Sequence, residues 1–383
     1  MYQETNIFEI LNDKYFLPKK VRLFESFSGI GCQRMAFKRL GIEVEMVGIS
    51  EIDKYAIQSY MAIHSPTRNW GDITKIRGQD LPEVDVFTYS FPCTDLSKAG
   101  KQKGLSSTRS GLVYEVLRIL HEMNKLPQVL IMENVVDLVQ TKFIREFNDI
   151  QRELESLGYK NYTETLNAKD YGVAQNRDRV FMVSILGEYY YEFPKPFKLT
   201  SRLKDYLETN VDEKYYLSDK TLGKISKWNS QQNPVENAKT KDDDYVQCIT
   251  AKSNTSTNAS MLLLLEPMIC ASRGRNPQNP KSRESGLETV QMIEVNESGL
   301  SNTLTTVQKD NMVVEPTLRI RKLTPRETGR LMGMLDDEID KQLEVVSNSQ
   351  AYKQHGNGIV VDVFAYLLST MIKTEEQSGN KIE

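Results

Sequence analysis

The sequence predicts an α/β fold organised around a mostly parallel sheet. Between positions 21 and 186, short apolar runs alternate with longer segments in which apolar residues recur every three or four positions. This alternation is typical of βαβ units, in which helices join parallel strands. Such sheets bind ligands at the carboxyl ends of their strands, so the residues after each apolar run are the first candidates for function.

The first strand is expected in VRLFESF, followed by the glycine turn SFSGIG and the helical segment QRMAFKRL. Gly29 and Gly31 have no side chains, so a ligand can approach the backbone where the helix begins. Arg34 stands where a G-x-G-x-x-G nucleotide motif has its last glycine. An ordinary tight turn is therefore the alternative interpretation.

The second strand, VEMVGIS, leads into Glu51. This acid follows Gly29 by about 20 residues, the spacing at which a carboxylate accepts hydrogen bonds from ribose hydroxyls. The alternative for Glu51 is a plain surface role. Asp72, in WGDIT before the third strand, is expected to accept a hydrogen bond from an adenine amino group.

The third strand, VDVFTYSF, is followed by Pro92 and Cys93, and the fourth, QVLIMEN, ends in Glu133 and Asn134. Most free cysteines are small core hydrophobes, but this one lies at a strand end before a polar loop with several lysines, a placement that favours thiolate chemistry. Glu133 as a loop anchor is the competing interpretation. Because adjacent parallel strands end at one edge, Cys93 and Glu133 are expected in one crevice.

The chain changes character near position 190, which predicts a second domain. Residues 195–320 are polar and rich in asparagine, with strand candidates in MLLLLEPMICA, ETVQMIEV and NTLTTV. Regular structure resumes at LTPRETGRLMGM, where Thr324, Pro325 and Glu327 fit the N-cap, first position and capping-box acid of a helix. A last helix in GIVVDVFAYLLSTMI is expected to return to the first domain. The predicted units are 1–194, 195–320 and 321–383.

Composition limits the classes of function. The net charge of −3 neither requires nor excludes nucleic acid, because binding depends on clusters of cations, and these occur at 98–103, 273–283 and 319–322. The four cysteines lack C-x-x-C spacing, so neither a zinc site nor a disulfide framework is expected, and no metal. No apolar run approaches the length of a membrane span, so we expect a soluble cytoplasmic protein without membrane contact.

Six motifs occur in the order SFSGIG, SFPCTDLS, MENV, QNRDRV, LTPRETGRLMG and YKQHGNGIVV. They resemble the ordered motifs of the DNA cytosine-5 methyltransferase family, over about residues 21–190 and 320–372, and the length resembles a stand-alone bacterial or phage enzyme. The resemblance implies a Rossmann-like, S-adenosylmethionine-dependent methyltransferase fold with a smaller, loop-rich target-recognition domain at 195–320. S-adenosylhomocysteine would be the cofactor product.

The resemblance also implies the roles of individual residues. Cys93 would add to C6 of a cytosine flipped out of the duplex, Glu133 would bind its N3 and amino group, and Arg177 and Arg179 would support both. The positions that match the cofactor site are Phe27, Ser28, Gly29, Gly31, Glu51, Ile52, Asp72, Ile73, Pro92, Leu112 and Asn357. The positions expected to contact DNA are Ser97, Lys101, Arg109, Arg273, Arg275 and Thr303, the two later arginines in a loop that reaches a groove.

Three positions depart from the family pattern. Cys32 stands where another glycine is usual; its small side chain is expected to be tolerated there and to tighten the cofactor turn. His355 and Gly358 replace an aromatic residue and a serine around Asn357. The sequence therefore leaves open whether one hydrogen bond to the cofactor forms. None of the three touches Cys93 or the acid of the MENV motif, so activity is expected.

The predicted function is transfer of a methyl group from S-adenosylmethionine to C5 of cytosine in a short, specific duplex DNA site. A monomer is expected, in the cytoplasm and associated with the nucleoid through DNA, with a possible restriction endonuclease that acts separately. The alternatives are the same chemistry on transfer RNA, a catalytically silent DNA-binding protein and a nicotinamide-dependent oxidoreductase. The long segment 195–320 favours DNA over transfer RNA, and intact Cys93, Glu133 and Arg179 favour an enzyme. The sequence does not specify the recognised bases.

Overall fold

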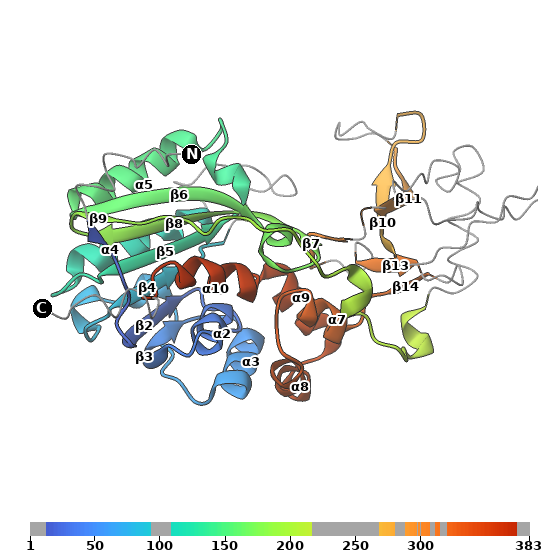
Figure 1. The fold of residues 1–383 in the computed structure, drawn as a ribbon, viewed down its shortest axis with the longest axis horizontal. Coiled ribbons are helices and arrows are strands. Elements are labelled where there is room, and N and C mark those ends of the chain that lie inside the picture. Colours follow the sequence, from blue (N-terminus) through green and yellow to red (C-terminus); the bar gives the residue numbers. More distant parts are fainter. Residues whose placement is uncertain are drawn as a thin grey trace, which may run out of the picture.

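The computed structural model describes residues 13–92, 109–216, 268–279, 288–296, 298, 300–306, 311–314 and 320–373. Its centre is a six-stranded sheet with the order β3-β2-β4-β5-β8-β6 (Figure 1). The strands of this sheet are β2 (Lys20–Ser26), β3 (Glu43–Ser50), β4 (Val86–Tyr89), β5 (Val129–Asn134), β6 (Tyr159–Asn167) and β8 (Asp178–Leu186). Strands β3, β2, β4 and β5 run parallel, and β8 is antiparallel to both of its neighbours. The predicted α/β fold with a mostly parallel sheet is confirmed.

One strand of this sheet, β6, is not among the strands that the sequence predicts. It lies at the sheet edge beside β8 and buries only Tyr159 and Leu166. Its remaining side chains are mostly polar and at least partly exposed, so the apolar pattern that indicates a strand is weak.

Helices cover both faces of the sheet and create two hydrophobic cores (Figure 1). The helices are α2 (Cys32–Arg39), α3 (Lys54–His64), α4 (Val113–Glu122), α5 (Ile144–Ser156), α7 (Pro325–Arg330), α8 (Asp336–Val345), α9 (Asn348–Asn357) and α10 (Val361–Ser369). Helices α2 and α10 contribute to one core, and α4 and α5 to the other. Successive residues of β2 serve opposite cores, Leu23 the first and Phe24 the second, because side chains alternate across a sheet.

Short 3₁₀ helices and two-residue strands complete the described structure. They are β1 (Asp13–Lys14), η1 (Ile73–Lys75), η2 (Gly78–Asp80), η3 (Arg109–Leu112), η4 (Val136–Val139), η5 (Ala168–Tyr171), β7 (Gln175–Asn176), β9 (Tyr189–Tyr190), η6 (Leu203–Tyr206), η7 (Glu213–Tyr215) and β12 (Ser301–Asn302). Strand β1 pairs with β9, and β12 pairs with β7. None of the described helices has the length and apolar character needed to cross a membrane.

Helix α7 begins at the residues that the sequence predicts. Thr324 Oγ1 accepts a hydrogen bond from the Glu327 N–H at 3.2 Å, and Glu327 Oε2 accepts one from the Thr324 N–H at 2.8 Å. This reciprocal pair is the expected capping box. Glu327 is fully buried and also forms an ion pair with buried Arg321 at 2.7 Å, so the carboxylate is satisfied on both oxygens.

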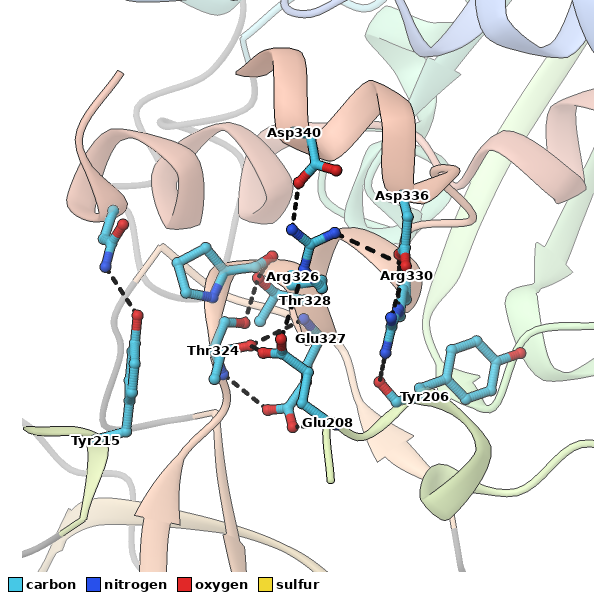
Figure 2. A network of polar contacts seen from close by, with 12 residues as sticks. Tyr206, Glu208, Tyr215, Thr324, Arg326, Glu327, Thr328, Arg330, Asp336 and Asp340 are labelled. Carbon is cyan, nitrogen blue, oxygen red and sulfur yellow. Dashed lines mark hydrogen bonds and ion pairs between the residues drawn. The ribbon is translucent and has the colours of Figure 1, made fainter. Parts of the chain in front are cut away.

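Charged side chains tie α7 to its neighbour α8 (Figure 2). Arg330 donates two hydrogen bonds to Asp336, at 2.8 and 2.7 Å, where α8 begins. Arg326 pairs with Asp340 one turn later. Figure 2 shows both guanidinium groups pointing from α7 toward α8, so each turn of α7 is held to α8 by an ion pair.

A second sheet, four-stranded and antiparallel, lies to one side of the large one (Figure 1). Its strands are β10 (Met268–Arg275), β11 (Val290–Asn296), β13 (Met312–Val314) and β14 (Ile320–Lys322). Cys270, Ile293, Met312 and Val314 form its small core. The division of the chain at 195 and 321 stays a prediction.

The loop expected at RGRNPQNPKSR is wrong for its first two arginines. Arg273 and Arg275 belong to β10 and pair with β11. Arg275 donates to both carboxylate oxygens of Glu294 on β11, with Nη2 at 2.8 Å from Oε2. The sequence did not indicate this part of the strand, because SRGR has no alternation of apolar and polar residues. The acid that pairs with Arg275, Glu294, also lies 19 residues further along the sequence.

Candidate active site

A cavity of about 340 Å³ opens where the parallel strands end. The segments after β2, β3, β4 and β5 form much of its wall, together with the end of α9. The predicted catalytic and cofactor residues that line it are Phe27, Ser28, Gly29, Glu51, Ile52, Asp72, Ile73, Pro92, Leu112, Glu133, Arg177, Arg179 and Asn357. Gly31 is not in the lining, because its α-carbon faces Tyr60 and His64 of α3.

The glycine turn after β2 has a backbone conformation that residues with a side chain adopt only at an energetic cost. Gly29 and Gly31 have φ angles of 55° and 79°, in the left-handed region. Glu51, after the next strand, holds this turn: its Oε2 accepts a hydrogen bond from the Gly29 N–H at 2.9 Å, and its Oε1 accepts from the N–H groups of Ile52 and Asp53 at 2.8 Å. Because a carboxylate oxygen has two lone pairs, Oε2 can accept a further hydrogen bond from a ligand.

Replacing Gly31 by alanine is expected to lower the free energy of unfolding by about 3 kcal/mol, through left-handed backbone strain and overpacking. A Cβ there would lie 2.5 Å from His64 Nε2 and 2.6 Å from Tyr60 Cε2. Gly29→Ala is the matched control, because nothing lies within 4 Å of its Cβ position and only the backbone cost of about 1–2 kcal/mol applies. Urea unfolding of both variants measures the difference, and equal losses would contradict this account of the turn.

Apolar and acidic side chains form the wall beside the turn. Ile52 is 73% exposed, which is high for a large apolar side chain, whereas Ile73 is buried. Asp72 Oδ1 accepts hydrogen bonds from the Thr74 N–H at 3.0 Å and the Thr74 hydroxyl at 2.9 Å. These bonds, the backbone one first, lower the pKa of Asp72, so it is a charged acceptor at the cavity wall.

Glu133 lies at the end of β5 and is only 6% exposed. Burial raises the pKa of its carboxyl group, while the charges of Arg179 and Arg177 act in the opposite direction. The nearer guanidinium is that of Arg179, whose Nε lies 3.1 Å from Glu133 Oε1. A carboxyl group that keeps its proton above its usual pKa can donate that proton in a hydrogen bond to a ligand nitrogen.

Arg177 lines the same cavity but makes different contacts. It is buried and donates hydrogen bonds to the carbonyl oxygens of Leu304 at 3.1 Å, Gly356 at 3.1 Å and Gly358 at 2.7 Å. The last two carbonyls flank Asn357. Arg177 therefore holds the end of α9 against the cavity, a contact that the strand pattern did not predict.

Several predicted residues lie outside the described part of the chain. These are Cys93, Ser97 and Lys101, together with the side chain of Arg109, whose backbone begins η3. The segment that leads to Cys93 is described as far as Pro92, which lines the cavity. Asn134 fixes this segment, because its Nδ2 donates to the Phe91 carbonyl oxygen at 3.2 Å.

A model of the C-5 cytosine-specific DNA methylases matches residues 21–373, which include every residue that lines the cavity. The chain belongs to the C-5 cytosine-specific DNA methylase family. It is an enzyme, a DNA cytosine-5 methyltransferase, and the family uses S-adenosylmethionine as methyl donor.

Relatives match the methyltransferase over most of its length. The type II methyltransferase M2.ScrFI of Lactococcus lactis subsp. cremoris is 33% identical, with 93% of this chain and 100% of that protein covered. The type II methyltransferase M.NlaX of Neisseria lactamica is 32% identical, with 91% and 96% covered.

Solved structures show the same fold. The methyltransferase EhMeth of Entamoeba histolytica superposes with a TM-score of 0.61 at 19% identity, over 92% of this chain and 98% of that one. A putative DNA modification methyltransferase encoded within an Escherichia coli prophage superposes with a TM-score of 0.56 at 18% identity, over 91% and 98%. The α/β fold inferred from the sequence is thus shared with methyltransferases.

Two of the positions that are expected from the sequence to depart from the family pattern, Cys32 and Gly358, lie next to each other. Cys32 is only 4% exposed, and burial raises the pKa of its thiol to about 12, so it stays protonated near neutral pH. A Cβ at Gly358 would lie 3.3 Å from Cys32 Sγ, closer than an ordinary contact. The Gln354 carbonyl oxygen is at 3.2 Å from the same position, so the glycine at 358 leaves room for both the carbonyl group and the sulfur.

The third departure, His355, is a buried residue outside the cavity lining. Its Nδ1 lies 2.8 Å from Thr328 Oγ1, and its Nε2 lies 2.8 Å from Gln342 Oε1. Burial lowers the pKa of His355 to about 3, so the ring is neutral. The sequence did not indicate the neighbouring residue, Gln354, which does line the cavity. The motif YKQHGNGIVV contains Gln354, but nothing in the motif indicates where its side-chain amide lies.

The predicted DNA contacts that the structure describes are engaged within the protein. Thr303 donates from Oγ1 to the Asn176 carbonyl oxygen at 2.6 Å. Arg273 lies 3.6 Å from Glu294, which also holds Arg275. Contact of these residues with DNA stays a prediction.

Proposed function

We propose that the cavity binds S-adenosylmethionine and that Cys93 and Glu133 act there on a cytosine extruded from a short, specific duplex DNA site. The observation that carries this proposal is the position of Glu133: a buried carboxyl group with a raised pKa lines the same cavity as the glycine turn held by Glu51. Cofactor and base would then meet at one sheet edge, which the reaction requires.

The residues of the cavity fit the cofactor. Among the described residues, the buried Ser28 hydroxyl lines the cavity without a hydrogen-bond partner, as expected for a group that a ligand satisfies. Glu51 Oε2 has a lone pair for a ribose hydroxyl, Asp72 is a charged acceptor for an adenine amino group, and Ile52 offers exposed apolar surface to a ring. When bound, S-adenosylmethionine supplies an electrophilic methyl group and leaves as S-adenosylhomocysteine.

The residues of the chain activate the cytosine. Carbon 5 of cytosine is a weak nucleophile, so the Cys93 thiolate first forms a bond to C6. In its protonated form, the Glu133 carboxyl group donates to N3, which accommodates the electron density that the thiolate adds to the ring. Arg179 keeps Glu133 in place through the contact at 3.1 Å. After C5 is methylated, a base removes the C5 proton, the electrons of that C–H bond re-form the C5=C6 double bond, and the C6–S bond breaks to release Cys93 as a thiolate.

The remaining parts of the proposal concern DNA and the cell. We place phosphate contacts at Ser97, Lys101 and Arg109, and base reading in the unit 195–320, with Thr303, Arg273 and Arg275. The enzyme would act as a monomer in the cytoplasm, at the nucleoid, with no metal. A separate restriction endonuclease is consistent with the type II methyltransferases among its relatives.

Transfer of labelled methyl groups from S-adenosylmethionine to duplex DNA or to transfer RNA tests the substrate. We expect duplex DNA to be labelled at least about a hundredfold faster, with the label recovered as 5-methylcytosine after digestion to nucleosides. Faster labelling of transfer RNA would overturn the substrate. Label on another atom of DNA would overturn the chemistry assigned to Cys93 and Glu133.

A further inference from the structure

Gln354, on α9, has a buried amide whose nitrogen has no hydrogen-bond partner among the described residues. The residue is 8% exposed and lines the cavity, and its Nε2 makes no hydrogen bond. Buried amide N–H groups are rarely left unpaired because the loss of hydration is not offset. A buried donor at the wall of a binding cavity therefore indicates a ligand that accepts its hydrogen bond.

The other end of the same amide is held by two donors. Gln354 Oε1 accepts hydrogen bonds from Ser59 Oγ at 2.8 Å and from Gln342 Nε2 at 2.7 Å. Ser59 belongs to α3 and Gln342 to α8, so the amide is fixed between two helices. With its oxygen bonded in this way, Gln354 can offer only its nitrogen to the cavity.

A buried chain of hydrogen bonds sets the direction of this amide. Gln342 Oε1 lies 2.8 Å from His355 Nε2, and His355 Nδ1 lies 2.8 Å from Thr328 Oγ1. An amide oxygen only accepts, so His355 carries its proton on Nε2, and its Nδ1 is then an acceptor. The one proton of the Thr328 hydroxyl can go to this Nδ1 or to the carbonyl oxygens of Thr324 and Pro325, which lie 3.2 and 3.0 Å away. A reversed chain would need the proton of His355 on Nδ1 and both amides turned over.

The far end of this chain is anchored in α7 (Figure 2). Thr328 lies between residues that fix α7: Glu327 pairs with buried Arg321, and Arg330 donates twice to Asp336. The chain therefore runs from α7 through His355 of α9 and Gln342 of α8 to Gln354, again on α9, which lines the cavity, while Ser59 of α3 is a second donor to the Gln354 oxygen.

We propose that Gln354 Nε2 donates a hydrogen bond to an acceptor atom of the bound S-adenosyl ligand, and that Thr328, His355 and Gln342 position this donor. The inference rests on the proposed function, because it takes the cavity as the S-adenosylmethionine site. Gln354 is then a cofactor-binding residue, and His355, which departs from the family pattern, is a positioning residue.

Binding of S-adenosylhomocysteine to the full chain, measured by isothermal titration calorimetry, tests the role of Gln354. Gln354→Ala is expected to weaken binding about 10- to 100-fold, and Gln354→Glu at least as much, because a carboxylate has no donor to offer. Gln350→Ala is the matched control: it removes a glutamine one turn earlier on α9 that is not in the cavity lining, and affinity should stay within about twofold. Thermal unfolding checks that each variant is folded.

The outcomes separate this inference from the proposed function. If the unaltered protein does not bind S-adenosylhomocysteine, the cofactor assignment of the cavity fails. If it binds and folded Gln354→Ala binds equally well, the inference alone is overturned. The analogue 5′-methylthioadenosine, which lacks the amino-acid part, locates the acceptor: an affinity loss limited to S-adenosylhomocysteine places it in the carboxylate, and an equal loss for both ligands places it in the adenosine.

The ring tautomer of His355 tests the direction of the chain. The protein has 3 histidines, so labelling them with ¹⁵N gives few ring signals in NMR spectra. In the complex with S-adenosylhomocysteine, His355 is expected to be neutral with its proton on Nε2. A proton on Nδ1 would reverse the chain and contradict the assignment of Gln354 as donor.

Discussion

Glu133→Gln is expected to lower the rate of methyl transfer about a thousandfold, with little change in folding. The amide cannot deliver a proton to N3 of the cytosine, and a general acid contributes on the order of 10²- to 10⁴-fold to a rate. The amide oxygen can still accept a hydrogen bond from Arg179, which lies 3.1 Å from the carboxylate in the native protein. The local structure should therefore survive.

Single-turnover methylation of duplex DNA at saturating cofactor measures this effect apart from binding. Glu164→Gln is the matched control, because Glu164 is exposed on the edge strand β6 of the same sheet and outside the cavity lining. Its rate should stay within about twofold of the native rate. If Glu133→Gln methylates DNA as fast as this control, Glu133 does not act as an acid in the reaction.

Cys93→Ser is expected to lower turnover on the order of 10⁴-fold or more, while cofactor and DNA still bind. A serine hydroxyl is a far weaker acid than a thiol, so it supplies almost no anion to attack C6 near neutral pH. Equilibrium binding of duplex DNA by fluorescence anisotropy should change only a few-fold, because the substitution removes the reacting atom and leaves Lys98, Lys101 and Lys103 in place.

Cys270→Ser is the control for loss of a thiol elsewhere. Cys270 is buried in the small sheet, and burial raises the pKa of its thiol to about 12. Its replacement should affect stability and leave turnover of the folded protein within about threefold. Native turnover by Cys93→Ser would show that another group attacks the ring.

The sequence predicts those parts of the fold that depend on local pattern. Apolar runs indicated the strands of the parallel half of the sheet, and Thr324 with Glu327 marked the start of α7 because a capping box involves residues only three positions apart. Strand β6 was missed because it is a polar edge strand. Arg275 was assigned to a loop because its partner, Glu294, comes from another strand.

The candidate site divides in the same way. Glu51 and Glu133 could be found because parallel strands end at a common edge, and the cavity contains both. The contacts of Arg177 and Gln354 could not, because they depend on carbonyls and side chains from distant segments that only the folded chain brings together. The role of Cys93 follows from the resemblance and stays a prediction.

The central claim is that Cys93 bonds to the cytosine ring within the cavity that holds Glu133 and the cofactor. Duplex DNA in which the target cytosine carries fluorine at C5 tests it most directly, because the fluorine cannot leave as a proton does and the enzyme stays attached. Mass spectrometry after digestion is expected to show DNA bound to the peptide that contains Cys93, in the presence of S-adenosylmethionine and not with Cys93→Ser. Normal methylation of unmodified DNA together with no adduct, or an adduct at another residue, would contradict the account.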